Sequence, residues 1–509
     1  MCFSIFAETS TRIFYMFKAG FDNNAYLRTQ SEKIQERIAK FGGKLYLEFG
    51  GKLFDDHHAS RVLPGFEPDS KIRMLEKLKD KAEVVIAINA GDIEKNKVRG
   101  DLGITYDMDV LRLIDAFRGY GLYVSSVVLT RFQGQASALA YQKKLEGLGL
   151  RVYRHYPIEG YPGNIPLIVS DDGYGRNEYV ETTRELVVVT APGPGSGKMA
   201  VCLSQLYHEN KRGVNAGYAK FETFPIWNIP LKHPVNLAYE AATADLNDVN
   251  MIDPFHLEAY GKTTINYNRD VEIFPVLNAI FQRIMGESPY KSPTDMGVNM
   301  AGNCIIDDDA VCDAARQEIV RRYFNTKCQV RKGNADADQV YKIELLMEQA
   351  HVNTTARPVV EAALKKAEET DGPAVAIELT DGAIITGKTT SLLGASSVML
   401  LNALKHLAGI PDEVRLLSPM VIEPIQNLKT KHLGHNNPRL HTDEVLIALS
   451  VCALTDYNAK IAMEKLNELK HCEVHSTVIL SQVDVGVFRR LGVNLTTEPN
   501  YQTSKLYHG

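Results

Sequence analysis

Short runs of β-branched residues alternate with amphipathic segments through the first half of the chain, and this alternation constrains the fold more than any other feature. Helical periodicity fills the intervals at 69–81, 107–120 and 136–148. Intervals of this length are too long for hairpins, so they predict parallel strands joined by crossover helices. The sequence therefore predicts an α/β fold with a doubly wound, mainly parallel sheet. The predicted strands are 44–49, 83–89, 123–130, 166–170 and 185–190.

The second half of the chain has a different pattern. Apolar periodicity at 271–285 and 310–323 predicts helices. Two short apolar runs, 374–379 and 383–386, flank the turn residues Thr380-Asp381-Gly382 and predict a β-hairpin. Further helices are predicted at 336–350, 357–370, 391–408 and 443–454, and a late strand at 473–481.

A chain of 509 residues is too long for one hydrophobic core, so several domains are expected. We expect residues 1–15 to be a leader of uncertain order and residues 16–268 to form an α/β phosphate-binding domain. A helical segment follows at 269–330. Residues 331–509 are expected to form a smaller, mixed α+β C-terminal domain.

Composition excludes several classes of protein. The formal net charge is −5 and no basic run is long enough to hold a nucleic-acid backbone, so nucleic acid is not an expected partner. No stretch approaches the roughly 20 apolar residues that cross a bilayer, which argues against a membrane partner. The seven cysteines are scattered without CxxC spacing and are expected to be reduced core thiols. We expect a cytoplasmic homo-oligomer.

One motif carries most of the functional prediction. Residues 185–190 form an apolar run, the glycine-rich turn Ala-Pro-Gly-Pro-Gly-Ser-Gly-Lys follows, and an amphipathic segment begins near Lys198. Glycine adopts φ > 0 without strain, so consecutive amides can turn around an anion at the positive end of a helix. Lys198 adds a mobile positive charge. The predicted phosphate-binding residues are Gly193, Gly195, Ser196, Gly197 and Lys198.

This motif departs from the P-loop pattern GxxxxGK[ST] at two positions. Pro192 replaces the first glycine, and Met199 replaces the hydroxyl that would bind Mg²⁺. A thioether is a poor ligand for that hard cation. The alternative is a glycine-rich connection with a solvated lysine. A literal match at 382–389 has β-branched residues at its variable positions, and the hairpin accounts for them.

Two polar clusters supply further candidates. Lys52, Asp55, His58 and Arg61 follow a predicted strand and therefore lie at the carboxyl edge of the predicted sheet, as candidates for acid–base catalysis or for holding an anion. The alternative is a solvated loop. Asp245, Asp248 and Asp253 are candidate ligands for a divalent cation, and a nucleoside triphosphate with Mg²⁺ is the corresponding cofactor. The alternative for these aspartates is capping and turn formation.

Long runs of this sequence resemble a known family. The runs are 41–56, 191–200, 245–256 and 391–397, and they are similar to the bacterial uncharacterised protein family UPF0371. The resemblance covers about residues 17–507, whereas residues 1–15 depart from the family pattern. The family pattern includes Met199, and the resemblance implies no established activity.

Three functional hypotheses remain open at this point. The first is an enzyme that transfers a phosphoryl or nucleotidyl group to or from a small molecule, because such chemistry depends on positioning and charge neutralisation. The second is a non-hydrolysing protein that senses a nucleotide or a phosphorylated metabolite. The third is an assembly protein in which the glycine-rich loop is vestigial.

Overall fold

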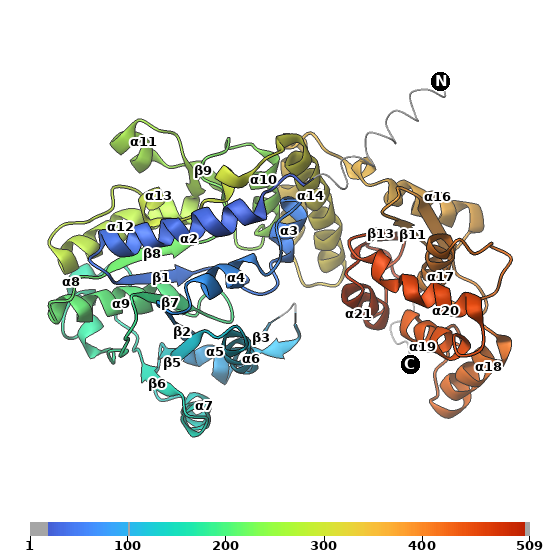
Figure 1. Cartoon of the computed structure of the whole chain (residues 1–509), viewed down its shortest axis with the longest axis horizontal. Coiled ribbons are helices and arrows are strands. Elements are labelled where there is room, and N and C mark those ends of the chain that lie inside the picture. The colour runs from blue at the N-terminus through green and yellow to red at the C-terminus, as the bar shows by residue number, and fades with distance from the viewer. Residues whose placement is uncertain (1–18, 100–101, 504–509) are drawn as a thin grey trace. The chain divides into compact units, whose positions relative to one another are not determined.

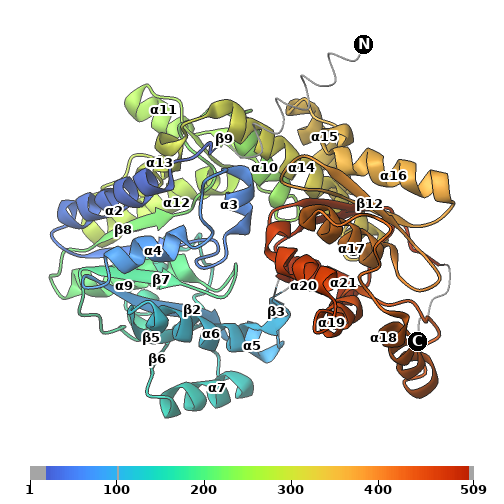
Figure 2. The same cartoon turned by 45° about the vertical axis from the view of Figure 1, so that its right-hand side comes forward.

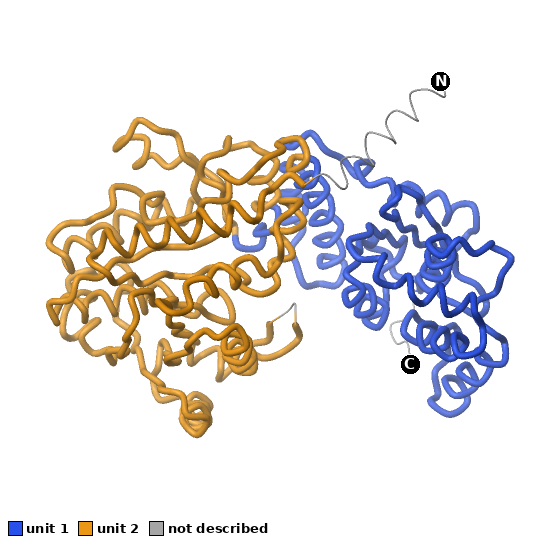
Figure 3. The backbone as a smooth tube through the Cα atoms, in the orientation of Figure 1, with its two compact units in different colours: residues 1–18, 241–246, 313–509 blue, residues 19–240, 247–312 orange. Residues whose placement is uncertain are grey.

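A computed structural model describes residues 19–99 and 102–503 (Figure 1). The predicted leader, 1–15, lies outside the described residues. The chain divides into two compact units (Figure 3). The N-terminal unit comprises 19–240 and 247–312, and the C-terminal unit comprises 241–246 and the chain from 313 on. The division at 268 and 330 expected from the sequence remains a prediction.

The N-terminal unit is built on a six-stranded sheet in which every pairing is parallel, with the order β6-β5-β2-β7-β1-β8. This sheet confirms the predicted α/β class and the parallel pairing. The strands are β1 (Leu45–Phe49), β2 (Ala82–Asn89), β5 (Tyr123–Thr130), β6 (Arg151–Arg154), β7 (Leu186–Thr190) and β8 (Gly217–Phe221).

The prediction of a strand at 166–170 is wrong. These residues overlap the short helix α8 (Ile165–Ile168), in which Asn164 accepts a hydrogen bond from the Leu167 amide and a proline occupies the first turn. Proline suits that position because its missing N–H has no acceptor there. The sequence analysis also missed β6 and β8, because neither has a run of β-branched residues.

Strand register brings the ends of three strands to one edge of the sheet. Leu45 of β1 lies opposite both Leu186 of β7 and Gly217 of β8. Since the three strands run in the same direction for the same length, the residues that follow each of them leave the sheet side by side. We call this line the carboxyl edge.

Helices cover both faces of the sheet. Side chains of α9 and α12, including Val201 and Phe274, share a buried cluster with Tyr46, Val187 and Tyr218, which belong to three different strands. On the opposite face, α6 contacts β2 and β5, while α2 and α4 pack side by side and α2 contacts β8 (Figure 2). The helices that begin in this unit are α2 (Asn23–Lys40), α3 (His57–Val62), α4 (Ser70–Lys77), α5 (Ala90–Glu94), α6 (Tyr106–Gly119), α7 (Ala136–Gly147), α8, α9 (Lys198–Lys211), α10 (Pro234–Ala242), α11 (Pro254–Tyr260), α12 (Asn268–Met285), α13 (Pro293–Met296) and α14 (Asp308–Arg331).

Two small antiparallel pairs complete the N-terminal unit. One consists of β3 (Val98–Arg99) and β4 (Ile104–Thr105), and the other of β9 (Asn250–Ile252) and β10 (Ile265–Tyr267). The short 3₁₀ segments η1 (Tyr174–Arg176) and η2 (Ala301–Cys304) lie between the larger elements.

The C-terminal unit contains a separate, smaller sheet of mixed pairing. Its order is β12-β11-β13-β14, with parallel pairing only between β13 and β14 among the described strands. The antiparallel pairing of β11 with β12 confirms the predicted hairpin and explains the literal P-loop match at 382–389. The strands are β11 (Ala374–Glu378), β12 (Ile384–Lys388), β13 (Glu473–Ser476) and β14 (Asn494–Thr497).

The core of this unit lies on both faces of the small sheet. Val375 and Ile377 pack with Met399 and Leu449 on one face, and Ala376 packs with α16 on the other. The helices of the unit are α15 (Ala337–Gln349), η3 (Thr354–Ala356), α16 (Pro358–Thr370), α17 (Ala395–Ala408), α18 (Pro419–Asn427), the π-helical η4 (Leu428–His432), α19 (Thr442–Cys452), α20 (Tyr457–Glu464), η5 (Lys465–Leu469) and α21 (Gln482–Arg490). Within the described residues, no helix is long and apolar enough to cross a bilayer.

The hairpin makes a testable prediction at Gly387. A methyl group at this position would overlap the backbone of Met399 and the carbonyl of Ala395 in α17. We expect Gly387→Ala to lower the free energy of unfolding by about 1–3 kcal/mol, the usual cost of overpacking, as measured by denaturant titration. Gly372→Ala is the control, since the nearest atom to its added methyl is 3.7 Å away. Equal stability of the two variants would contradict this packing.

Candidate functional site

The glycine-rich loop occupies the carboxyl edge between β7 and α9. Gly195 and Gly197 have φ values of 76° and 87°, as the sequence predicted, and Gly197 is the N-cap residue directly before α9. The buried Ser196 hydroxyl donates to the Gly193 carbonyl at 2.9 Å. The Thr130 hydroxyl, at the end of β5, donates to the Ser196 carbonyl at 2.7 Å. The loop is therefore held from within and from a nearby strand.

The Gly193 and Ser196 carbonyls of this loop accept hydrogen bonds, whereas three of its amides donate none. Within the part of the chain that the structure describes, the N–H groups of Gly195, Ser196 and Gly197 make no hydrogen bond to the protein. Pro194 and Gly195 are exposed, so solvent reaches the loop. Unpaired amides at the start of a helix are the usual donors to a bound anion.

Gly193 was expected to adopt a positive φ, but its φ is not positive. Its small size serves another purpose: the hydroxyl and ring of Tyr106 occupy the space that a side chain would need. Tyr106 begins α6, and Lys97 lies over its ring at 4.9 Å from the centroid. Gly193 therefore allows the loop to lie against α6.

Positive charge gathers on the same side of the sheet. Lys198 occupies the first position of α9 and is partly exposed. Arg131 directly follows Thr130 and is exposed, with a φ of 51°. A positive φ is uncommon for a residue other than glycine and often marks a functional position. Lys198 therefore adds positive charge next to the amides of the loop.

The left-handed conformation of Gly197 yields a second prediction. We expect Gly197→Ala to lower the free energy of unfolding by about 2 kcal/mol, because it adds a left-handed alanine and a close contact with Thr130. Gly213→Ala is the matched control, as its φ is 71° and no atom lies within 4 Å of the added methyl. Differential scanning calorimetry should therefore show a smaller loss for Gly213→Ala than for Gly197→Ala.

The predicted catalytic group from Lys52 to Arg61 follows β1, but its members have different surroundings. Lys52 is exposed, and Arg61 is partly buried on α3. Asp55 lies 3.8 Å from the Arg99 guanidinium. The His58 ring packs edge-on against the ring of Phe224. The structure therefore directs Asp55 toward β3 and His58 toward the residues that follow β8.

The sequence analysis overlooked the buried ion pair in this loop. The Lys71 ammonium lies 2.7 Å from the Asp56 carboxylate, and 2% of the Lys71 side chain is exposed. Burial alone would raise the pKa of Asp56, but Lys71 and the Ala59 amide outweigh burial and lower that pKa. Asp56 also accepts from the Ala59 amide at 3.1 Å and so caps α3. This pair anchors the loop that carries the predicted catalytic group.

Two of the three predicted metal ligands have surroundings that match the alternative of capping and turn formation, and the third forms an ion pair. Asp253 is buried, accepts from the His256 amide at the start of α11, and accepts from the Thr294 hydroxyl at 2.7 Å. Asp248 pairs with Arg269 at 3.2 Å. Asp245 is exposed in a turn. None of the three belongs to a described group of side chains close enough to share an ion.

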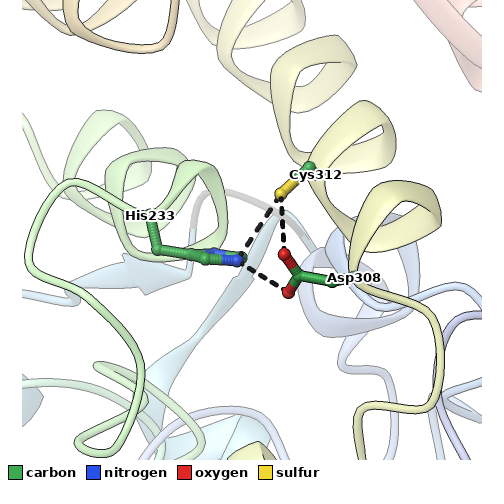
Figure 4. A group of neighbouring side chains, drawn as sticks. All are labelled: His233, Asp308 and Cys312. Carbon is green, nitrogen blue, oxygen red and sulfur yellow. Dashed lines mark hydrogen bonds and ion pairs between the residues drawn. The ribbon is translucent and has the colours of Figure 1, made fainter.

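One group of potential metal ligands does occur among the described residues (Figure 4). Nε2 of His233 lies 3.0 Å from Asp308 and 3.5 Å from the Cys312 sulfur. However, Nδ1 of His233 accepts the Val235 amide at 3.2 Å. A neutral imidazole has one protonated nitrogen, so the hydrogen is on Nε2, where a metal would need a lone pair. We interpret this group as a hydrogen-bonded link between the starts of α10 and α14.

A partly buried charged group lies at the end of β8, and it was not predicted from the sequence because that strand was not. The Lys220 ammonium lies 2.6 Å from Asp270, at the start of α12, and 3.3 Å from Glu222. Glu222 faces Gly50, where any side chain would collide with it. Nearby, the Tyr218 hydroxyl donates to Glu48 at 2.6 Å, so the ends of β1 and β8 share this group.

The charges of this group influence one another. Burial raises the pKa of Glu222 above its ordinary value; the Lys220 ammonium opposes this shift, whereas Asp270 and Glu48 add to it. Burial alone would lower the pKa of Lys220, but the carboxylates of Asp270 and Glu222 outweigh burial and raise it. Lys220 therefore stays protonated, and Glu222 is the carboxyl of this group whose pKa is raised.

This shift gives a third prediction. A carboxyl whose pKa is raised on folding supports the fold below its unfolded pKa and loses that contribution as the pH rises through its folded pKa. We expect Glu222→Gln to increase the free energy of unfolding at pH 8 by roughly 1 kcal/mol and to change little at pH 4. Urea titration at both pH values measures the difference. Glu272→Gln, an exposed position on α12, should be neutral at both. A loss of stability at pH 8 in Glu222→Gln would contradict the direction of the shift.

Family models identify the class of this protein. The N-terminal domain of unknown function DUF1846 matches residues 19–351, and its C-terminal counterpart matches residues 355–507. A UPF0371 protein of Corynebacterium diphtheriae is 61% identical over 489 residues, which cover 96% of this chain and 98% of that protein. A UPF0371 protein of Streptococcus uberis is 56% identical over 97% of this chain and its own full length. The chain belongs to the UPF0371 family.

Proposed function

We propose that the chain binds a phosphate-bearing small molecule, with nucleotides as first candidates, on the loop from Gly193 to Lys198, and that it is an enzyme of phosphoryl or nucleotidyl transfer. The observation that carries this proposal is the set of amides at Gly195, Ser196 and Gly197 that lack a hydrogen-bond acceptor among the described residues. An oxyanion would accept these hydrogens, and the helix dipole of α9 would favour its charge.

The position of the loop in the sheet supports the same proposal. The connection after β7 enters α9 on one face, whereas α6 packs against β2 on the other. Open α/β sheets bind ligands outside the carboxyl ends of strands where neighbouring connections diverge in this way. The glycine-rich loop lies at such a point, directly after β7.

A second observation favours an enzyme over a sensor. The loop alone would suffice for binding, and Met199 lacks the hydroxyl that holds Mg²⁺ in ordinary P-loops. The carboxyl edge, however, also carries the titratable Glu222 and the buried Glu48. Burial raises the pKa of the Cys202 thiol in α9; the Glu48 carboxylate adds to this shift, and the Lys198 ammonium opposes it. Both charges therefore lie near the start of α9. Carboxylates close to a phosphate site suit proton transfer or binding of a hydrated Mg²⁺. A non-hydrolysing sensor is the alternative.

The binding proposal is tested with the full chain and defined probes. We expect ATP, GTP or pyrophosphate, with and without Mg²⁺, to raise the melting temperature by a few degrees at saturation, since a ligand at 100 times its Kd stabilises by about 2.7 kcal/mol. Lys198→Ala should weaken this shift at least tenfold in apparent affinity, as expected for loss of a charged hydrogen bond. Thermal-shift titration measures both effects.

Lys143→Ala is the matched control, because Lys143 is an exposed lysine on α7 of the same unit. Unchanged binding in Lys198→Ala would place the ligand elsewhere, and no shift with any probe would remove both ligand-binding hypotheses. Turnover of bound nucleotide supports the enzyme, whereas tight binding without turnover supports the sensor.

A further inference from the structure

A small cavity opens beside the charged group at the end of β8. Its volume is about 50 Å³, enough for one small polar group of a ligand. Lys220, Glu222 and Asp270 form its polar wall, Asn266 lies beside them, and Phe224 and Trp227 form part of its apolar wall. The cavity therefore brings a proton acceptor, a cation and an apolar surface together at one place.

The charges in the cavity select the kind of group that fits. Lys220 is bound at 2.6 Å by Asp270, which neutralises it, while Glu222 lies farther from Lys220, at 3.3 Å. An anion would be repelled by both carboxylates, and an ammonium group would compete with Lys220 for them. A neutral hydroxyl can donate to Glu222 and accept from Lys220 at once, and the carbon that carries it can contact the aromatic wall.

The cavity and the glycine-rich loop lie at the same edge of the sheet, so the terminal phosphate of an extended donor held on the loop has to reach the hydroxyl in the cavity. Strands are spaced about 4.8 Å apart, so the ends of β7 and β8, on either side of β1, are about 10 Å apart. Both sites lie at the same carboxyl edge of one unit.

We propose that this cavity receives the acceptor hydroxyl of a small alcohol or polyol, and that Glu222 is the general base that takes the hydroxyl proton. This inference rests on the proposed transfer reaction. In the step, the hydroxyl oxygen forms a bond to phosphorus, and the bond from phosphorus to the leaving oxygen of the donor breaks. The leaving oxygen keeps the electron pair, and the proton moves to the Glu222 carboxylate.

The electrostatics of the wall suit this role. A general base is most effective when its pKa approaches the working pH, and burial raises the pKa of Glu222 in that direction. Four charged groups shift the pKa of Glu222: Lys220 and Arg269 lower it, whereas Asp270 and Glu48 raise it. Since Asp270 holds Lys220 in place, the ammonium can donate to the hydroxyl oxygen while Glu222 accepts its proton.

The first test measures binding without a phosphate donor. Ligand-observed saturation-transfer NMR of the full chain should detect glycerol and ethane-1,2-diol but not 1,2-dimethoxyethane, which has no hydroxyl hydrogen. We expect Glu222→Leu to abolish the glycerol signal and Glu222→Gln, which keeps a hydrogen-bond acceptor, to retain it. Glu272→Leu is the control for a surface substitution. Failure to detect either diol, or an equal signal in Glu222→Leu when that variant is folded, would overturn the assignment of the cavity.

The second test measures the transfer itself, with ATP and Mg²⁺ as donor and glycerol as acceptor. We expect Glu222→Gln to lower kcat at least 100-fold, to leave the KM for ATP unchanged, and to remove the acidic limb of the pH profile. A profile that keeps this limb would overturn the role of Glu222. If ATP fails to bind, the donor proposal fails alone, because the diol experiment decides the cavity independently.

Discussion

The parallel register of β1, β7 and β8 is the constraint on which the rest of the N-terminal unit depends. Leu45 pairs with strands on both sides, so three connections that are far apart in sequence leave the sheet at one edge. The glycine-rich loop, the Asp56–Lys71 pair and the Glu222 group all follow these strands. A shift of this register by one residue would turn buried side chains to the opposite face and would separate the three groups.

Close approach of backbone to side chain determines the detailed form of the carboxyl edge. Gly50 leaves room for Glu222, Gly193 leaves room for Tyr106, and Gly197 leaves room for Thr130. Each contact joins residues from different connections, and each is made possible by the lack of a Cβ atom. The loop can therefore leave amides without a protein acceptor while its other side is packed.

Much of this fold was predicted from local sequence patterns, because strand propensity and turn residues act over only a few positions. β2, β5 and β7 were found from their β-branched residues, and the hairpin of β11 and β12 from its turn residues. β8 was not predicted because it has no such run. The grouping of Lys220 and Glu222 at its end was therefore not predicted either. Asp253 was predicted as a metal ligand, but aspartate serves equally as a helix cap, and the following residues decide between the two. The cysteines were predicted as core thiols, and five of the described thiols are buried.

The sequence by itself determined the alternating strands and helices, the family, and the glycine-rich turn between β7 and α9, because propensity, periodicity and glycine content act over a few residues. The tertiary structure alone decided which charges meet. Glu222 faces Gly50, Lys220 faces Asp270, and His233 faces Asp308, because long-range strand pairing and helix packing bring their elements together. The environment that raises the pKa of Glu222 arises from that pairing, since burial and neighbouring carboxylates are properties of the folded chain.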